Sequence, residues 1–108
     1  MNIYYYRKSS GNEPVKEFID SVPDHDKARI FFDLNLLRQR GLKDCGLSLR
    51  HIEGKLWEIR IKLSVGYRIF YCCASENLCL LHAYKKQSQK APEKEIKIAL
   101  KRMGEVLP

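Results

Sequence analysis

The chain has 108 residues, 44% of them hydrophobic, and this size predicts one compact domain spanning residues 1–108. Twenty lysine and arginine residues against thirteen aspartate and glutamate residues give a formal net charge of +7. Such an excess of positive charge favours nucleic acid as the ligand. On charge alone, a basic protein that binds no polyanion is an equal alternative. No apolar stretch is long enough for export or membrane spanning, so we expect a cytoplasmic protein with no membrane partner.

The cysteine pattern favours neither a disulfide framework nor a metal site. Cys72 and Cys73 are adjacent, Cys45 and Cys79 stand alone, and no CxxC pair of the kind that binds zinc is present. We therefore interpret the four cysteines as small buried apolar residues, and we expect neither a metal nor a cofactor.

The first part of the chain predicts one strand and two helices. Residues 3–6 are β-branched and aromatic, which is typical of a strand. Pro14 can begin a helix capped by Asn12, and Pro23 ends that helix. A second helix is expected between Pro23 and Gly41, because its apolar residues recur at helical spacing. These two helices form an αα-hairpin whose apolar stripe is fully explained as core.

From Leu47 the hydrophobic period changes from that of a helix to that of a strand. Alternating segments at residues 47–53, 55–61, 66–73 and 78–85 predict three or four antiparallel strands in a meander. A last helix is expected to begin at Pro92 and to end at Gly104. The element order β-α-α-β-β-β-α describes a single α+β domain.

Side chains alternate between the two faces of a strand, so each meander strand can be sorted into two sets. The apolar set, which we expect the helices to cover, comprises Trp57, Ile59, Ile61, Leu63, Tyr67, Ile69, Tyr71, Cys79, Leu81 and Ala83. The opposite set brings Arg60, Arg68, His82 and Tyr84 together on an uncovered face. That face is predicted to be a cationic, partly aromatic concavity.

A cluster of arginine, lysine, histidine and tyrosine, without a carboxylate pair or a set of metal ligands, matches the needs of metal-free RNA cleavage. In that reaction the ribose 2′-hydroxyl attacks the adjacent phosphate, which requires a proton acceptor, a donor to the leaving 5′-oxygen and cations for the phosphorane charge. Arginine offers a fixed fork of donors for phosphate. Tyrosine or lysine can exchange protons only if its pKa is lowered, whereas His82 needs no such shift.

Each candidate also has a purely structural interpretation. Arg60 could pair with Glu58 or Glu53 on the sheet surface. His82, within an apolar strand, could be a hydrogen-bonded structural histidine, and Tyr84 could pack at the rim of the domain. Further candidates for RNA binding, which could equally be solvated surface residues, are His51, Lys55, Lys62, Lys85 and Lys90.

Three motifs together resemble a known family. They are LWEIR at residues 56–60, YRI at residues 67–69, and HAYKKQSQKAP at residues 82–92. Their form and spacing, with the N-terminal strand and αα-hairpin, resemble the RelE/ParE superfamily of toxins, and within it the phage-derived Gp49-like, HigB-type branch. The resemblance covers essentially the whole chain and implies a RelE-like α+β fold.

The resemblance implies the toxin of a type II toxin–antitoxin system that acts as a metal-independent mRNA endonuclease, typically at the ribosome. The partner would be a helix-turn-helix HigA-like antitoxin, which could form a hetero-oligomer with the toxin. By position, Arg60 and Arg68 would bind and stabilise the phosphate. Tyr84 or Lys86 would be the base, and His82 or Lys86 the acid.

The chain departs from the family pattern near the last motif. Gln87 replaces a lysine and removes a charge, Ala83 replaces a glycine, Ala91 replaces a threonine, and Tyr84 replaces a phenylalanine and could add a proton-transfer group.

Two other functions remain open. One is a non-catalytic ParE-type inhibitor that binds a protein such as DNA gyrase, which would not need a cationic face. The other is an RNA-binding module without turnover, which should expose aromatic residues on its sheet.

Overall fold

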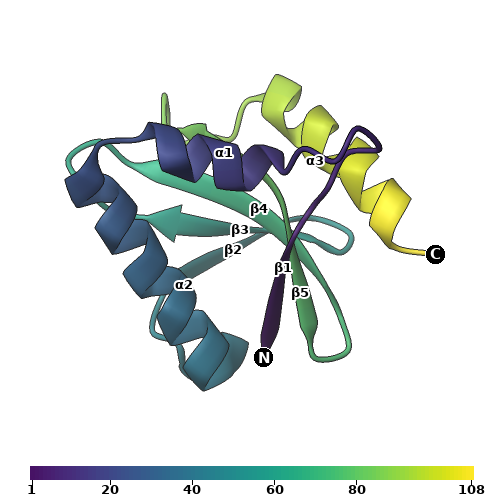
Figure 1. Cartoon of the computed structure of the whole chain (residues 1–108), viewed down its shortest axis with the longest axis horizontal. Coiled ribbons are helices and arrows are strands. Elements are labelled where there is room, and N and C mark those ends of the chain that lie inside the picture. The colour runs from purple at the N-terminus through teal and green to yellow at the C-terminus, as the bar shows by residue number, and fades with distance from the viewer.

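The computed structural model describes residues 1–108 and forms an α+β fold built around one sheet (Figure 1). The elements are β1 (Asn2–Tyr5), α1 (Pro14–Ser21), α2 (Asp24–Asp44), β2 (Ser48–Glu53), β3 (Leu56–Ile61), β4 (Tyr67–Ala74), β5 (Asn77–Lys85) and α3 (Glu93–Val106). The strand order is β1-β5-β4-β3-β2. The antiparallel meander is confirmed for β2 to β5, and β1 adds a parallel strand beside β5.

The two faces of the sheet pack against different helices. Side chains of α1 and α2, such as Ile19 and Leu34, share one buried cluster with Ile59 and Ile69 of the sheet. Ala99 of α3 belongs to a second cluster, which contains Phe70 and other residues of the opposite face. The α1–α2 pair therefore forms the main core, and α3 forms a smaller core on the other side of the sheet.

The expectation of an uncovered second face is wrong. Along α3, Ile96, Ala99, Leu100 and Met103 form an apolar stripe that must be buried against some surface, and the second face of the sheet provides it. Tyr84 is buried on this side of the sheet as a consequence. The cationic face is thus a partly covered recess.

A bulge in β5 changes which of its side chains share a face. Phe70 pairs with His82, but the next residue, Tyr71, pairs with Leu80, so Leu81 is an extra residue. Leu80 therefore joins the α1–α2 cluster, and Leu81 joins the α3 cluster. The uniform alternation predicted for this strand was wrong on the N-terminal side of the bulge.

Several details at the ends of elements differ from expectation. Asn12 is not the cap of α1, since Glu13 occupies that position and makes no side-chain cap hydrogen bond. Gly104 does not end α3, which continues to Val106. Gly41 has φ 75° and interrupts the helical backbone of α2 where an end was predicted, but the helix resumes to Asp44. The left-handed φ at Gly41 suits glycine, which lacks a Cβ.

Trp57 lies on the face of the sheet that the first two helices cover, yet 38% of it is exposed. It lies near the β2–β3 turn, beside a cavity of about 490 Å³ that the helices leave unfilled. Its predicted burial was therefore wrong.

The cysteines lie in and around the two cores. Cys45 and Cys72 are buried, as predicted, whereas Cys73 and Cys79 are only partly buried, and all four are free thiols. No three side chains of the metal-binding types are grouped so as to hold an ion. None of the helices combines the length and the apolar character needed to span a bilayer.

Candidate active site

Two rows of side chains cross the second face of the sheet, because residues that pair across neighbouring strands point to the same side. One row runs from Ser48 through Arg60 and Arg68 to Tyr84. The other row runs from Arg50 through Glu58 and Phe70 to His82. Strand pairing thus places two arginines directly opposite each other, next to a glutamate.

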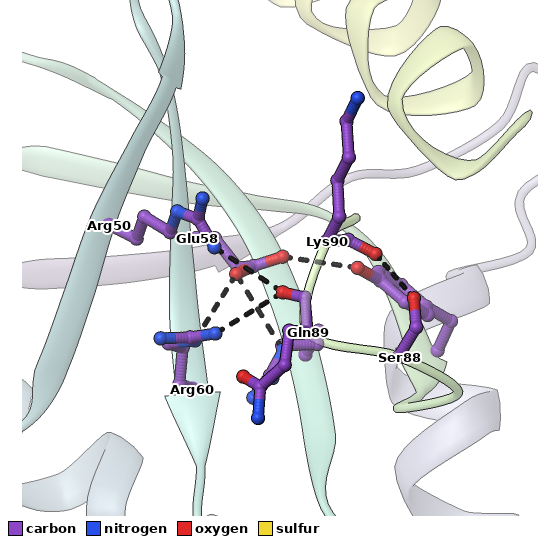
Figure 2. Close-up of polar contacts among 8 residues, drawn as sticks. Arg50, Glu58, Arg60, Ser88, Gln89 and Lys90 are labelled. Atoms are coloured by element: carbon purple, nitrogen blue, oxygen red, sulfur yellow. Dashed lines mark hydrogen bonds and ion pairs between the residues drawn. The ribbon is translucent and has the colours of Figure 1, made fainter. Parts of the chain in front are cut away.

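Glu58 is the centre of the polar contacts on this face (Figure 2). Its Oε1 lies 3.7 Å from Nε of Arg60 and 3.7 Å from Nε of Arg68, and the Tyr84 hydroxyl donates a hydrogen bond to Oε2 at 3.1 Å. Glu58 is only 2% exposed. Its carboxylate therefore offsets the repulsion between the two guanidinium groups in a poorly solvated place. The pairing of Arg60 with Glu58, considered from the sequence as an alternative role, is present.

Burial changes the acid–base properties of this cluster. Burial, and then the charge of Glu58, raises the pKa of Tyr84. This shift is opposite to the one that a tyrosine base needs, so Tyr84 stays protonated and serves as a donor to Glu58. Burial, and then the neighbouring Arg60, lowers the pKa of Arg68, a group whose usual value lies far above neutral pH.

A pocket of about 370 Å³ opens beside the two arginines. It is lined by Arg60, Ile61, Lys62, Leu63, Ser64, Gly66, Arg68, Lys86 and Gln89. The lining includes four cationic side chains and no acidic one. The backbone N–H of Lys86 donates to the carbonyl of Gly66 at 2.8 Å, which fixes the start of the segment after β5 beside the β3–β4 loop. The pocket therefore suits an anionic group such as a phosphate.

The structure brings Arg60, Arg68, Lys62 and Lys86 together in this pocket but does not place His82 there. Nε2 of His82 donates to Oε1 of Glu95 at 2.8 Å, and Nδ1 of His82 lies 3.3 Å from a guanidinium nitrogen of Arg102. The same Arg102 nitrogen donates to the carbonyl of Leu81 at 2.9 Å. Burial lowers the pKa of His82. These contacts tie His82 to α3 in the manner of a structural histidine.

The remaining predicted RNA-binding residues are dispersed. The ring of His51 lies 2.8 Å from the carbonyl of Gly54 and meets the edge of Trp57. Lys55 lines the cavity beside Trp57, Lys90 lines a small cavity with Arg50 and His51, and Lys85 is exposed at the end of β5. None of these four residues lines the pocket between the two arginines.

Sequence reasoning missed three participants on this face, Arg50, Glu58 and Gln89. Arg50 and Arg60 each donate to the main-chain carbonyl of Gln89 at 3.4 Å (Figure 2). Sorting β2 into its two faces would have identified Arg50, because it alternates with His51. Glu58 had been considered only as an ion-pair partner. No sequence signal marks Gln89, because its contribution comes from the main chain.

Comparison with known proteins gives the family. The family model described as "Phage derived protein Gp49-like (DUF891)" matches residues 17–104, which include the three motifs and the whole lining of the pocket. A search of curated proteins found no match. The matched family is a RelE/HigB-like toxin family, which is consistent with the toxin of a toxin–antitoxin system and suggests an antitoxin partner. The resemblance inferred from the motifs is confirmed: the chain belongs to the phage-derived Gp49-like family.

Proposed function

We propose that this chain is the toxin of a type II toxin–antitoxin system and cleaves mRNA at the ribosome as a metal-independent endoribonuclease. The observation that carries the proposal is the pocket of about 370 Å³, whose lining has four cationic side chains and no acidic one. Such a lining attracts the phosphodiester backbone and provides the positive charge that a phosphorane transition state needs.

In the proposed mechanism, Arg60 and Arg68 bind the phosphate that is cleaved. The Glu58 carboxylate lies beside the Nε atom of each arginine and holds the two guanidinium groups in place. Arg60 and Arg68 also line the pocket, where their terminal nitrogens can donate to phosphate oxygens. Charge that builds up on those oxygens during the reaction then meets donors that are already in place.

Lys86 is the residue we assign to proton transfer. The 2′-oxygen forms a bond to phosphorus, its proton passes to water, the bond from phosphorus to the 5′-oxygen breaks, and the Lys86 ammonium protonates that oxygen. The products are a 2′,3′-cyclic phosphate and a 5′-hydroxyl. Tyr84 and His82 lie outside the lining of the pocket and make structural hydrogen bonds, so we assign them positioning roles.

The proposed partners follow from the family and the charge. A helix-turn-helix, HigA-like antitoxin would form a hetero-oligomer with the toxin and cover this cationic recess. The formal net charge of +7 would favour approach to ribosome-bound mRNA. We place this activity in the cytoplasm, where translating ribosomes are found.

Ribosomes programmed with a defined, end-labelled mRNA provide the test, using the purified wild type, Arg68→Ala and Arg40→Ala. Arg40 is an exposed arginine of α2 without an ion pair and is the matched control. We expect fragments ending in a 2′,3′-cyclic phosphate from the wild type and Arg40→Ala, and cleavage at least about 100-fold slower with Arg68→Ala. An mRNA with a 2′-deoxy nucleotide at the cleaved position should resist. Cleavage of that mRNA, or full activity of Arg68→Ala, would contradict the mechanism.

A further inference from the structure

Two guanidinium groups converge on a single neutral oxygen at the edge of the site. Arg50 on β2 and Arg60 on β3 each donate to the Gln89 carbonyl at 3.4 Å, from the same face of the sheet (Figure 2). The segment after β5 that carries Gln89 therefore lies over the end of both side chains. A carbonyl oxygen carries only a partial charge, so it offsets little of the repulsion between two cations.

Arg50 has no carboxylate of its own to neutralise it. Its register partner on β3 is Glu58, but the ion pairs of Glu58 are with Arg60 and Arg68. Burial lowers the pKa of Arg68 most, and the charges of Arg60 and, to a smaller extent, Arg50 lower it further. An anion bound between Arg50 and Arg60, in addition to the Glu58 carboxylate, would offset the uncompensated positive charge of Arg50.

The cationic surface continues beyond Arg50. A cavity of about 160 Å³ on this side is lined by Arg50, His51 and Lys90, together with the apolar residues Ile52, Ala91 and Ile96. Arg50 therefore lies between this small cavity and the pocket that contains Arg60 and Arg68. The cationic side chains Arg50 and Lys90 therefore line a second cavity beside the pocket of Arg60 and Arg68.

We propose that Arg50 and Arg60 form a second phosphate subsite, which binds the phosphodiester adjacent to the one held by Arg60 and Arg68. The inference rests on the proposed function, because it takes single-stranded RNA as the ligand. The Gln89 carbonyl occupies the position of a phosphate oxygen and is displaced when RNA binds. The ligand must then contain at least two consecutive phosphodiesters for full affinity.

The probe is a fluorescent 2′-O-methyl RNA trinucleotide, which has two phosphodiesters and cannot be cleaved by 2′-hydroxyl attack. Two further versions replace one or the other linkage with an uncharged methylphosphonate. Fluorescence anisotropy measures the dissociation constant of each probe for the purified wild type, Arg50→Ala, Arg50→Lys and Arg40→Ala. Arg50 is exposed, so its replacement should leave the fold intact, and circular dichroism checks this.

We expect each methylphosphonate to weaken binding to the wild type and to Arg40→Ala about tenfold. Arg50→Ala should bind the fully charged probe about tenfold more weakly and should become insensitive to replacement of one linkage while remaining sensitive to the other. Its salt dependence should also decrease, by about 0.7 in the slope of log K against log salt concentration. The affinity of Arg50→Lys should lie between those of the wild type and Arg50→Ala, because lysine keeps the positive charge but lacks the forked pair of donors of a guanidinium group.

Equal sensitivity of Arg50→Ala to both linkages, or no binding of the charged probe by the wild type, would overturn the subsite. Failure of the proposed function has a different signature. In that case the linkage-specific effect of Arg50 would be present, but programmed ribosomes would yield no cleaved mRNA. If mRNA is cleaved but Arg50→Ala shows no linkage-specific effect, the proposed nuclease activity is supported and the second subsite is contradicted.

Discussion

The Tyr84 hydroxyl donates a hydrogen bond to Oε2 of Glu58 at 3.1 Å, within the part of the sheet that α3 helps to bury. The other carboxylate oxygen faces Arg60 and Arg68. Tyr84 therefore restrains the carboxylate that in turn restrains the two arginines.

Replacement of Glu58 with glutamine should destabilise the protein. The substitution removes the buried counter-charge of two adjacent guanidinium groups, and we expect the free energy of unfolding to fall by about 3 kcal/mol. Urea denaturation followed by circular dichroism measures it. Glu53→Gln, at an exposed glutamate on β2, is the control and should change stability by less than about 0.5 kcal/mol. Equal stability of the two variants would show that Glu58 does not neutralise the arginine pair.

Tyr84→Phe should retain most of the cleavage activity. Since burial and Glu58 raise the pKa of Tyr84, its hydroxyl stays protonated near neutral pH and cannot act as the base. We expect a loss of about 1 kcal/mol in stability, from the missing hydrogen bond, and less than a tenfold loss in cleavage rate. Single-turnover cleavage measures the rate, with Arg68→Ala as the inactive reference. A loss of cleavage rate with Tyr84→Phe as large as that with Arg68→Ala would show that the Tyr84 hydroxyl takes part in catalysis.

Gly66→Ala should reduce cleavage without unfolding the protein. A Cβ at Gly66 would lie 3.2 Å from Cδ and 3.4 Å from Cβ of Lys86, so the Lys86 side chain must shift within the pocket. The backbone of Gly66 does not have a positive φ, so alanine is tolerated there. The cleavage rate should fall several-fold while the melting temperature changes little. Gly104→Ala meets no atom within 4 Å and should leave cleavage unchanged; an unchanged rate for Gly66→Ala as well would argue against Lys86 as the acid.

His82 should make stability depend on pH. Burial lowers the pKa of His82 below its ordinary value of 6.5, so below pH 6.5 the unfolded chain binds this proton more readily than the folded one. The contribution of neutral His82 to stability is therefore complete above about pH 6.5 and is lost as the pH falls through the folded pKa. Urea unfolding from about pH 7.5 to about pH 5 should show a flatter profile for His82→Gln than for the wild type and for the exposed control His51→Gln. Identical slopes in all three would contradict this contribution.

Local sequence patterns predicted most of the elements. Pro23 separates the two N-terminal helices, and the two-residue period from Leu47 onward gives the four meander strands. These signals are local, since each depends on neighbours in the chain. The parallel pairing of β1 with β5 joins Ile3 to Leu78, and no local pattern encodes such a distant contact.

Only part of the candidate site was predicted, because local patterns in the sequence do not encode contacts between distant residues. Alternation along β3 and β4 correctly placed Arg60 and Arg68 on one face, and the strand register sets them opposite each other. The bulge at Leu81 is an irregularity that strict alternation cannot anticipate, and the position of α3 over the sheet depends on tertiary packing. The bulge leaves His82 on its predicted face, and the position of α3 separates it from the pocket, because Glu95 and Arg102 of α3 contact the imidazole.

Mapping of mRNA 5′ ends in growing cells tests the central claim most directly. The wild type, Arg60→Ala, Arg68→Ala and the control Arg40→Ala would each be expressed from a tightly regulated promoter, and cellular mRNA would be mapped by primer extension during growth arrest. We predict new 5′ ends within translated frames for the wild type and Arg40→Ala, and their absence for Arg60→Ala and Arg68→Ala. Growth arrest with intact mRNA would contradict the nuclease and favour a ParE-type inhibitor of a protein target.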